Sequence, residues 1–136
     1  MEMLVNIDVE NLEQAANFYT SAFGLRPGRR IGAAGLELLG AAVPIWLLQK
    51  AAGSAAGPAT AQARSYQRHW TPLHLDIVVD DIEAALRRAL AAGAIQEAPL
   101  ATHAWGKLAL MADPFGHGFC LIQFLGRGYD EICDAC

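Results

Sequence analysis

Long hydrophobic runs and clusters of positive charge are both missing from this chain. The longest unbroken apolar stretch, from Ala41 to Leu48, is far shorter than the roughly 20 residues that cross a bilayer. Lysine and arginine gather only as the pairs Arg29–Arg30 and Arg87–Arg88, and the net charge is -4. We therefore expect neither a membrane span nor a basic face that binds nucleic acid directly.

Cysteine is scarce as well. The three cysteines are an odd number, which gives no basis for a disulfide framework. Cys120 lies in an apolar run, and the terminal Cys133-x-x-Cys136 spacing is predicted to be a frayed tail, because it lacks the context of a redox motif or a second pair for zinc. The first residues, Met1 to Met3, carry no signal-peptide regions. These features predict a cytoplasmic protein.

The chain does contain an internal repeat. "LVNIDVENLEQAA" (residues 4–16) aligns with "HLDIVVDDIEAAL" (residues 74–86) at an offset of about 70. In both copies apolar residues first alternate, as in a half-buried strand, and then recur at helical spacing. Asn11 and Asp81 are good N-cap residues, and Gly24 and Gly93 stand where each helix would end. Each copy therefore predicts a strand followed by a helix.

Three further strand-like segments follow each predicted helix. They are residues 29–31, 36–39 and 43–49 in the first half and residues 95–97, 107–111 and 119–124 in the second. The fold class is therefore predicted to be α+β, with two βαβββ repeats whose sheets surround a cleft and whose helices lie on the outer faces. We expect one domain, residues 1–136, made of a module (1–50), a flexible or exposed linker (51–70), a second module (71–125) and a tail (126–136).

The alternation also predicts which side chains face the cleft. Val5, Ile7 and Val9 are expected to meet the helix, so their neighbours point to the other side of the sheet. The same reasoning applies to the other strands that border the cleft. The predicted cleft-facing residues are Leu4, Asn6, Asp8, Pro44, Trp46, Leu48, His74, Asp76, Val78, Cys120 and Ile122.

Two segments carry a family resemblance. "NLEQAANFYTSAFGL" (11–25) and "DPFGHGFCLIQF" (113–124) resemble the first helix and the last turn and strand of the vicinal oxygen chelate superfamily, and the resemblance covers residues 3–125. This superfamily includes glyoxalase I, extradiol dioxygenases, fosfomycin-resistance enzymes and antibiotic-binding proteins of the bleomycin-resistance type. Its metal-ligand positions match Leu4, Trp46, His74 and Cys120, of which the first two cannot coordinate a metal. The resemblance therefore implies no metal and no cofactor here.

The leading hypothesis is that the protein binds and sequesters a planar aromatic natural product without catalysis. Such a ligand, for example a DNA-intercalating or peptide antibiotic, would stack on Trp46. The competing interpretation is that Trp46 only fills the core. The resemblance implies resistance or self-protection, and a homodimer whose clefts combine halves of two chains. The predicted ligand-binding residues are Trp46, Leu4, Asn6, Asp8, Leu48, His74, Asp76, Trp105, Cys120 and Ile122. No catalytic residue is predicted.

Two other functions remain open. One is a metal-dependent lyase, transferase or dioxygenase that uses His74 and Cys120 with further ligands. The other is a structural or regulatory module whose cleft binds a protein loop. Several aromatic residues flank the second module in predicted loops or strand starts, with surface packing as the competing interpretation; these are His69, Trp70, His103, Trp105 and His117. Asp113 is expected to cap the turn before the last strand.

Overall fold

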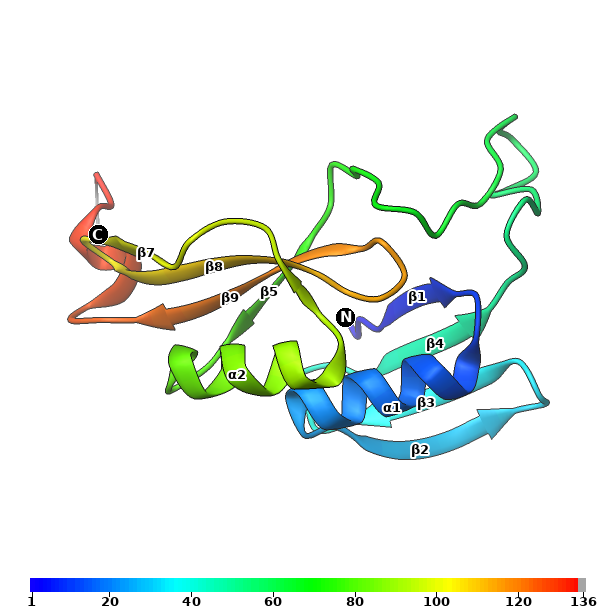
Figure 1. Ribbon diagram of the computed structural model, residues 1–136, viewed down its shortest axis with the longest axis horizontal. Coiled ribbons are helices and arrows are strands. Elements are labelled where there is room, and N and C mark those ends of the chain that lie inside the picture. The colour runs from blue at the N-terminus through cyan, green and yellow to red at the C-terminus, as the bar shows by residue number, and fades with distance from the viewer. Residues whose placement is uncertain (135–136) are drawn as a thin grey trace.

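The computed structural model describes residues 1–134 and contains two β-sheets and two α-helices (Figure 1). The first half contains β1 (Val5–Val9), α1 (Leu12–Phe23), β2 (Arg26–Ile31), β3 (Gly35–Leu39) and β4 (Ile45–Gln49). The second contains β5 (Leu75–Val78), α2 (Ile82–Ala92), β6 (Ile95–Gln96), β7 (Ala101–His103), β8 (Gly106–Ala112) and β9 (Gly118–Phe124), followed by a short 3-10 helix, Gly128–Glu131. The predicted α+β fold with two βαβββ repeats is confirmed.

The two sheets share one topology. The first has the strand order β1-β4-β3-β2, and the second has the order β5-β9-β8-β6. In each, the first strand runs parallel to the last strand of its half, while the remaining pairs are antiparallel. One strand is not predicted by the sequence: β7 pairs with β8 and lies between the predicted strand segments 95–97 and 107–111. A strand of three residues is too short to show an alternation.

Both helices begin and end where the sequence predicts. The Asn11 side chain accepts a hydrogen bond from the Gln14 amide at 2.9 Å, and the Asp81 side chain accepts one from the Ala84 amide at the same distance. The hydrogen bond from the Ala84 amide lowers the pKa of Asp81. Each helix ends at a glycine with a positive φ, Gly24 at 68° and Gly93 at 111°, a conformation that favours glycine.

The two helices join the halves of the chain. Each helix packs on its own sheet, and α1 and α2 pack against each other, as Figure 1 shows where the end of α2 adjoins α1. One continuous core cluster includes Val9 and Leu47 from the first sheet and Ala109 and Leu121 from the second. The opposite face of each sheet, turned away from its helix, is called here the open face.

The linker is exposed for much of its length but is anchored at several points. Arg64 forms a 2.6 Å ion pair with Asp8, and the Tyr66 hydroxyl donates a hydrogen bond to the carbonyl of Lys50. A Cβ added to Gly116 would overlap the carbonyl oxygen of Gln67, so the linker backbone passes directly over the turn between β8 and β9. Residues distant in sequence supply these contacts, which composition does not reveal.

Among the described residues no helix is both long and apolar enough to span a membrane. Cys120 is a free, buried cysteine. Cys133 is disulfide-bonded, which the odd cysteine count did not predict. The other residue of the predicted C-x-x-C tail, Cys136, lies outside the described residues.

Candidate functional site

The alternation in the first sheet places Trp46 on the open face. Its neighbour Leu47 is fully buried in the helix-side core, whereas Trp46, at 7% exposure, does not belong to that core cluster. In register, Trp46 lies between Asn6 on β1 and Glu37 on β3. Leu4, on the same side, is exposed. The indole therefore belongs to the surface that the sequence predicted as the cleft wall.

An ion pair covers the Trp46 ring. The guanidinium carbon of Arg29 lies 5.6 Å from the ring centroid, within the range of a cation–π contact. The same guanidinium donates two hydrogen bonds to Glu37, from Nε to Oε2 at 2.9 Å and from Nη2 to Oε1 at 2.6 Å. These bonds hold the pKa of Glu37 at about 2. Because Arg29 is largely exposed, a flat ligand can stack on its guanidinium plane or displace it from the indole.

The sequence reasoning missed Arg29 and Glu37, although a signal for one was present. Glu37 is the single acidic residue in the apolar strand β3, and a buried carboxylate needs a partner. Arg29 was harder to place, because the register between β2 and β3 shifts between Pro27 and Arg30. That bulge changes which side chains of β2 share a face with Trp46.

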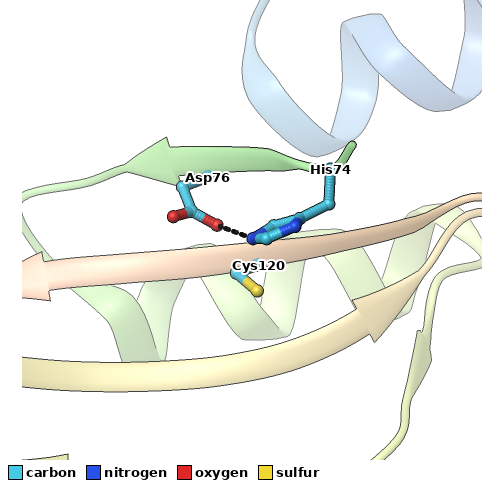
Figure 2. A group of neighbouring side chains, drawn as sticks. All are labelled: His74, Asp76 and Cys120. Atoms are coloured by element: carbon cyan, nitrogen blue, oxygen red, sulfur yellow. Dashed lines mark ion pairs between the residues drawn. The ribbon is translucent and has the colours of Figure 1, made fainter. Parts of the chain in front are cut away.

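The second sheet brings three potential ligand atoms together on its open face. Figure 2 shows His74 just before β5, Asp76 on β5 and Cys120 on the neighbouring strand β9. His74 Nε2 lies 3.2 Å from Asp76 Oδ1, and the ligand atoms of the three residues all lie within 4.8 Å of one another. The sequence predicted each residue for the cleft and placed His74 and Cys120 at metal positions. The structure adds Asp76 to them.

The donor set fits a divalent metal ion. An imidazole nitrogen, a carboxylate oxygen and a thiolate sulfur are accepted zinc ligands, and three protein ligands leave one position open for water or substrate. Burial, followed by the nearby Asp76 carboxylate, raises the pKa of the Cys120 thiol to about 11. The thiol is therefore protonated at neutral pH, and a bound cation would have to displace its proton. Leu4 and Trp46, at the other two positions that the sequence resemblance matches to metal ligands, cannot contribute.

A pocket of about 360 Å³ adjoins two of these three residues, His74 and Cys120. His74 and Cys120 line it together with Leu110, with Trp70 at the end of the linker and with Leu73 just before β5. Trp70 is 82% exposed and Leu73 is 85% exposed, so both are large apolar side chains with little packing of their own. Such groups at a pocket edge are typical of a surface that a ligand or a partner covers.

The open face of the second sheet is also apolar beyond this pocket. Val78 pairs in register with Ile122, and Leu110 pairs with Cys120. Val78, Leu110 and Phe124 each leave more than a third of their surface exposed. The sequence did not select Leu110 or Phe124, because it assigned cleft positions only in the first and last strands of each module and did not follow the last strand past Ile122. The alternation of β8 and β9 contains that signal.

The structure divides the predicted ligand-binding residues into separate groups. Trp46, Asn6, Asp8, Leu4 and Leu48 belong to the first sheet or its edge, and Trp46 is absent from the lining of the pocket beside His74. The Asp8 carboxylate is already engaged by Arg64.

Trp105 lies apart from both groups. Its ring stacks on that of His103, with centroids 5.1 Å apart and planes 7° from parallel, and it also contacts Phe124 and Tyr129. Gly106, the next residue, pairs with Phe124 in register. Phe124 is four residues beyond Cys120 on β9, or about 13 Å along the strand.

Comparisons with known proteins agree with the fold. The family model of the glyoxalase-like domain matches residues 4–122. An uncharacterized protein of Mycobacterium bovis, Mb0911c, is 41% identical over 54 residues, which are 39% of this chain and 36% of that protein. The chain thus spans about a third of the length of this relative.

Two solved structures are similar over most of the chain. A glyoxalase-related enzyme from Fulvimarina pelagi has a TM-score of 0.70 and 18% identity, covering 90% of this chain and 87% of that one. TnmS3, an antibiotic binding protein from Streptomyces sp. CB03234, has a TM-score of 0.63 and 22% identity, covering 92% and 96%. At these identities the likeness shows a common fold, and that fold includes both an enzyme and a binding protein.

Proposed function

The chain belongs to the glyoxalase-like domain family, and on that premise we propose that it binds and sequesters a planar aromatic natural product without transforming it. The observation that carries this proposal is the stacked pair of Trp46 and Arg29 on the open face of the first sheet. The exposed guanidinium offers a flat surface to an aromatic ring, and the indole beneath it offers another where the guanidinium is displaced. Neither group is a metal ligand. The likeness to an antibiotic binding protein supports the same class of ligand.

The separation of the predicted residues supports a site shared between two chains. Trp46 provides a stacking surface on one sheet, while Val78 and Leu110 provide exposed apolar area on the other. In a homodimer, the first sheet of one chain would face the second sheet of its partner, and both surfaces would close on one ligand. We place this homodimer in the cytoplasm, where stoichiometric binding would protect the cell from an antibiotic.

Tryptophan fluorescence provides the test. A panel of planar aromatic antibiotics is titrated in excess chelator into the wild-type protein, Trp46→Phe and Trp105→Phe, with sedimentation measured alongside. We expect saturable quenching with one ligand per site, weakened in Trp46→Phe and retained in the matched control Trp105→Phe. Equal affinity in all three proteins would remove Trp46 from the site, and no quenching across the panel would reject the proposed ligand class.

One observation favours a second function, a metal-dependent lyase, transferase or dioxygenase. His74, Asp76 and Cys120 supply three converging donors, one more than the sequence identified. This function requires tight binding of one divalent ion that His74→Ala and Cys120→Ser both weaken. It also requires that ligand binding in the fluorescence titration fails in chelator and returns when Zn²⁺, Ni²⁺, Mn²⁺ or Fe²⁺ is restored. That pair of results would favour the metal-dependent enzyme over metal-free sequestration.

A further inference from the structure

Two histidines meet where the linker crosses the second module. His69 belongs to the linker, and His117 belongs to the turn between β8 and β9. His69 Nε2 lies 2.9 Å from His117 Nδ1, and the ring centroids are 4.8 Å apart. Both side chains are partly buried. Neither the family match nor the donors at His74 account for this pair.

The outer nitrogen of each ring is fixed by a backbone carbonyl. His69 Nδ1 lies 3.0 Å from the carbonyl oxygen of Gln67, and His117 Nε2 lies 2.7 Å from that of Asp8. A carbonyl oxygen only accepts, so each of these ring nitrogens must carry the hydrogen. In two neutral rings, the inner nitrogens then both present lone pairs. Lone pairs 2.9 Å apart repel each other unless a cation lies between them.

This arrangement has the features of a transition-metal site. Imidazoles that bind a metal donate their other N–H group to a backbone carbonyl or carboxylate, which fixes the tautomer and the ring orientation. With a metal–nitrogen distance of about 2.1 Å, two nitrogens 2.9 Å apart subtend an angle of about 90° at the ion. That angle belongs to square-planar or octahedral coordination, which Cu²⁺ and Ni²⁺ adopt, and is narrow for tetrahedral Zn²⁺.

The charges around the pair do not exclude a cation. Arg64 and Arg68 are the positive groups nearby, but Arg64 is paired with Asp8 and Arg68 with Glu97. The buried Asp113 carboxylate accepts a hydrogen bond from the backbone amide of His117. Two arginines are thus matched by two paired carboxylates, and Asp113 adds one negative charge beside His117.

We propose that His69 and His117 bind one divalent transition metal ion, Ni²⁺ or Cu²⁺, with water completing its coordination. The ion would join the linker to the β8–β9 turn, which is itself bonded through His117 to the end of β1. It would therefore hold both modules and the linker in one arrangement, and would fix the position of Trp70 next to His69. This site is independent of the proposed sequestration, which needs no metal.

Calorimetry with Ni²⁺ tests the site on chelator-treated, desalted protein. We expect saturable binding of one ion and a raised melting temperature in wild type and in two controls, His74→Ala and His103→Ala. Both effects should be lost in His69→Gln and in His117→Gln. If binding persists in both glutamine variants, or disappears only in His74→Ala, the ion occupies another site and the proposal is wrong.

A spectroscopic measurement identifies the atoms that bind the ion. In the Cys120→Ser background, which removes a donor from the other metal candidate, one equivalent of Cu²⁺ should give an electron paramagnetic resonance spectrum with coupling to imidazole nitrogens. His69→Gln in that background should reduce this coupling. A spectrum without nitrogen coupling, or no bound ion at all, would show that the two rings do not bind Cu²⁺, and would overturn the proposal.

Discussion

Tyr19 on α1 donates a 2.7 Å hydrogen bond to Asp113, 94 positions later in the sequence. Both residues are buried, and Asp113 also accepts hydrogen bonds from the amides of Phe115 and His117. The sequence placed Asp113 correctly as the cap of its turn, but no pattern in it indicates Tyr19 as a partner. The bond joins the helix of the first module to the last turn of the second, and so links the two halves through polar as well as apolar contacts.

Removing this hydroxyl should destabilise the protein. Tyr19→Phe leaves the buried Asp113 carboxylate with one partner fewer, at a cost of about 1–3 kcal/mol in the free energy of unfolding. Urea denaturation at pH 7 measures it, with the exposed Tyr129→Phe as the control. A loss no greater than that of the control would show that Asp113 does not depend on Tyr19.

The same variant should change the alkaline limit of stability. Burial, followed by the charge of Asp113, raises the pKa of Tyr19 well above its ordinary value of 10.0. A group whose folded pKa is raised contributes stability below its unfolded pKa and loses it as the pH rises towards the folded value. Unfolding measured from pH 8 to 11 should therefore show a smaller loss of stability above pH 10 in Tyr19→Phe than in wild type.

The Arg29–Glu37 pair predicts the opposite pH dependence. Hydrogen bonds from Arg29 lower the pKa of Glu37 from 4.5 to about 2, so its contribution is complete above pH 4.5 and is lost as the pH falls towards 2. Glu37→Gln should destabilise the protein at pH 7. It should also reduce the loss of stability between pH 4.5 and pH 2. Its tryptophan emission should also change, because Arg29 is no longer held over Trp46. Glu2→Gln, at an exposed position, is the control for both readings.

The docking of the linker can be tested at Gly116. This glycine has a φ of 82°, and a Cβ there would overlap the carbonyl of Gln67. Gly116→Ala should loosen the linker and speed trypsin cleavage at Arg64 and Arg68. Gly53→Ala is a matched control, because its φ is 77° but nothing lies within 4 Å of the added Cβ. Equal cleavage of the two variants would show that backbone strain, rather than the overlap, sets the rate.

Local patterns accounted for most of the fold. The alternation of Val5, Ile7 and Val9 and the caps at Asn11 and Asp81 are signals within about a dozen residues, and the repeat shows each signal twice. The structure has each element they predict. The placement of Trp46 on the open face followed from the same alternation.

The candidate site was harder to predict because its contacts connect distant segments. Arg29 reaches Trp46 through a bulge, and His69 reaches His117 across 48 positions. No periodicity encodes either contact. The alternation did place His74, Asp76 and Cys120 on one face, but the sequence reasoning used only two of them as metal ligands.

The alkylation rate of the Cys120 thiol depends on its surroundings beside His74 and Asp76. Burial and the Asp76 carboxylate raise the pKa of this thiol to about 11, and the thiolate is the species that reacts with iodoacetamide. In the native protein, alkylation of the Cys120 peptide, followed by mass spectrometry, should be slow at pH 7 and accelerate towards pH 11. Asp76→Asn should speed it at pH 8, because it removes a negative charge that opposes ionisation.

The control for this reaction is Asp80→Asn, which removes a carboxylate from the same segment after the end of β5. Equal rates in wild type and Asp76→Asn would show that burial alone protects the thiol and that Asp76 is not coupled to it. The same alkylation measured with added Zn²⁺ tests whether the three residues bind a metal ion. Protection of Cys120 at pH 8 that requires both His74 and Asp76 would mean that the three residues bind an ion together, whereas an unchanged rate would leave the metal-free open face available to an aromatic ligand.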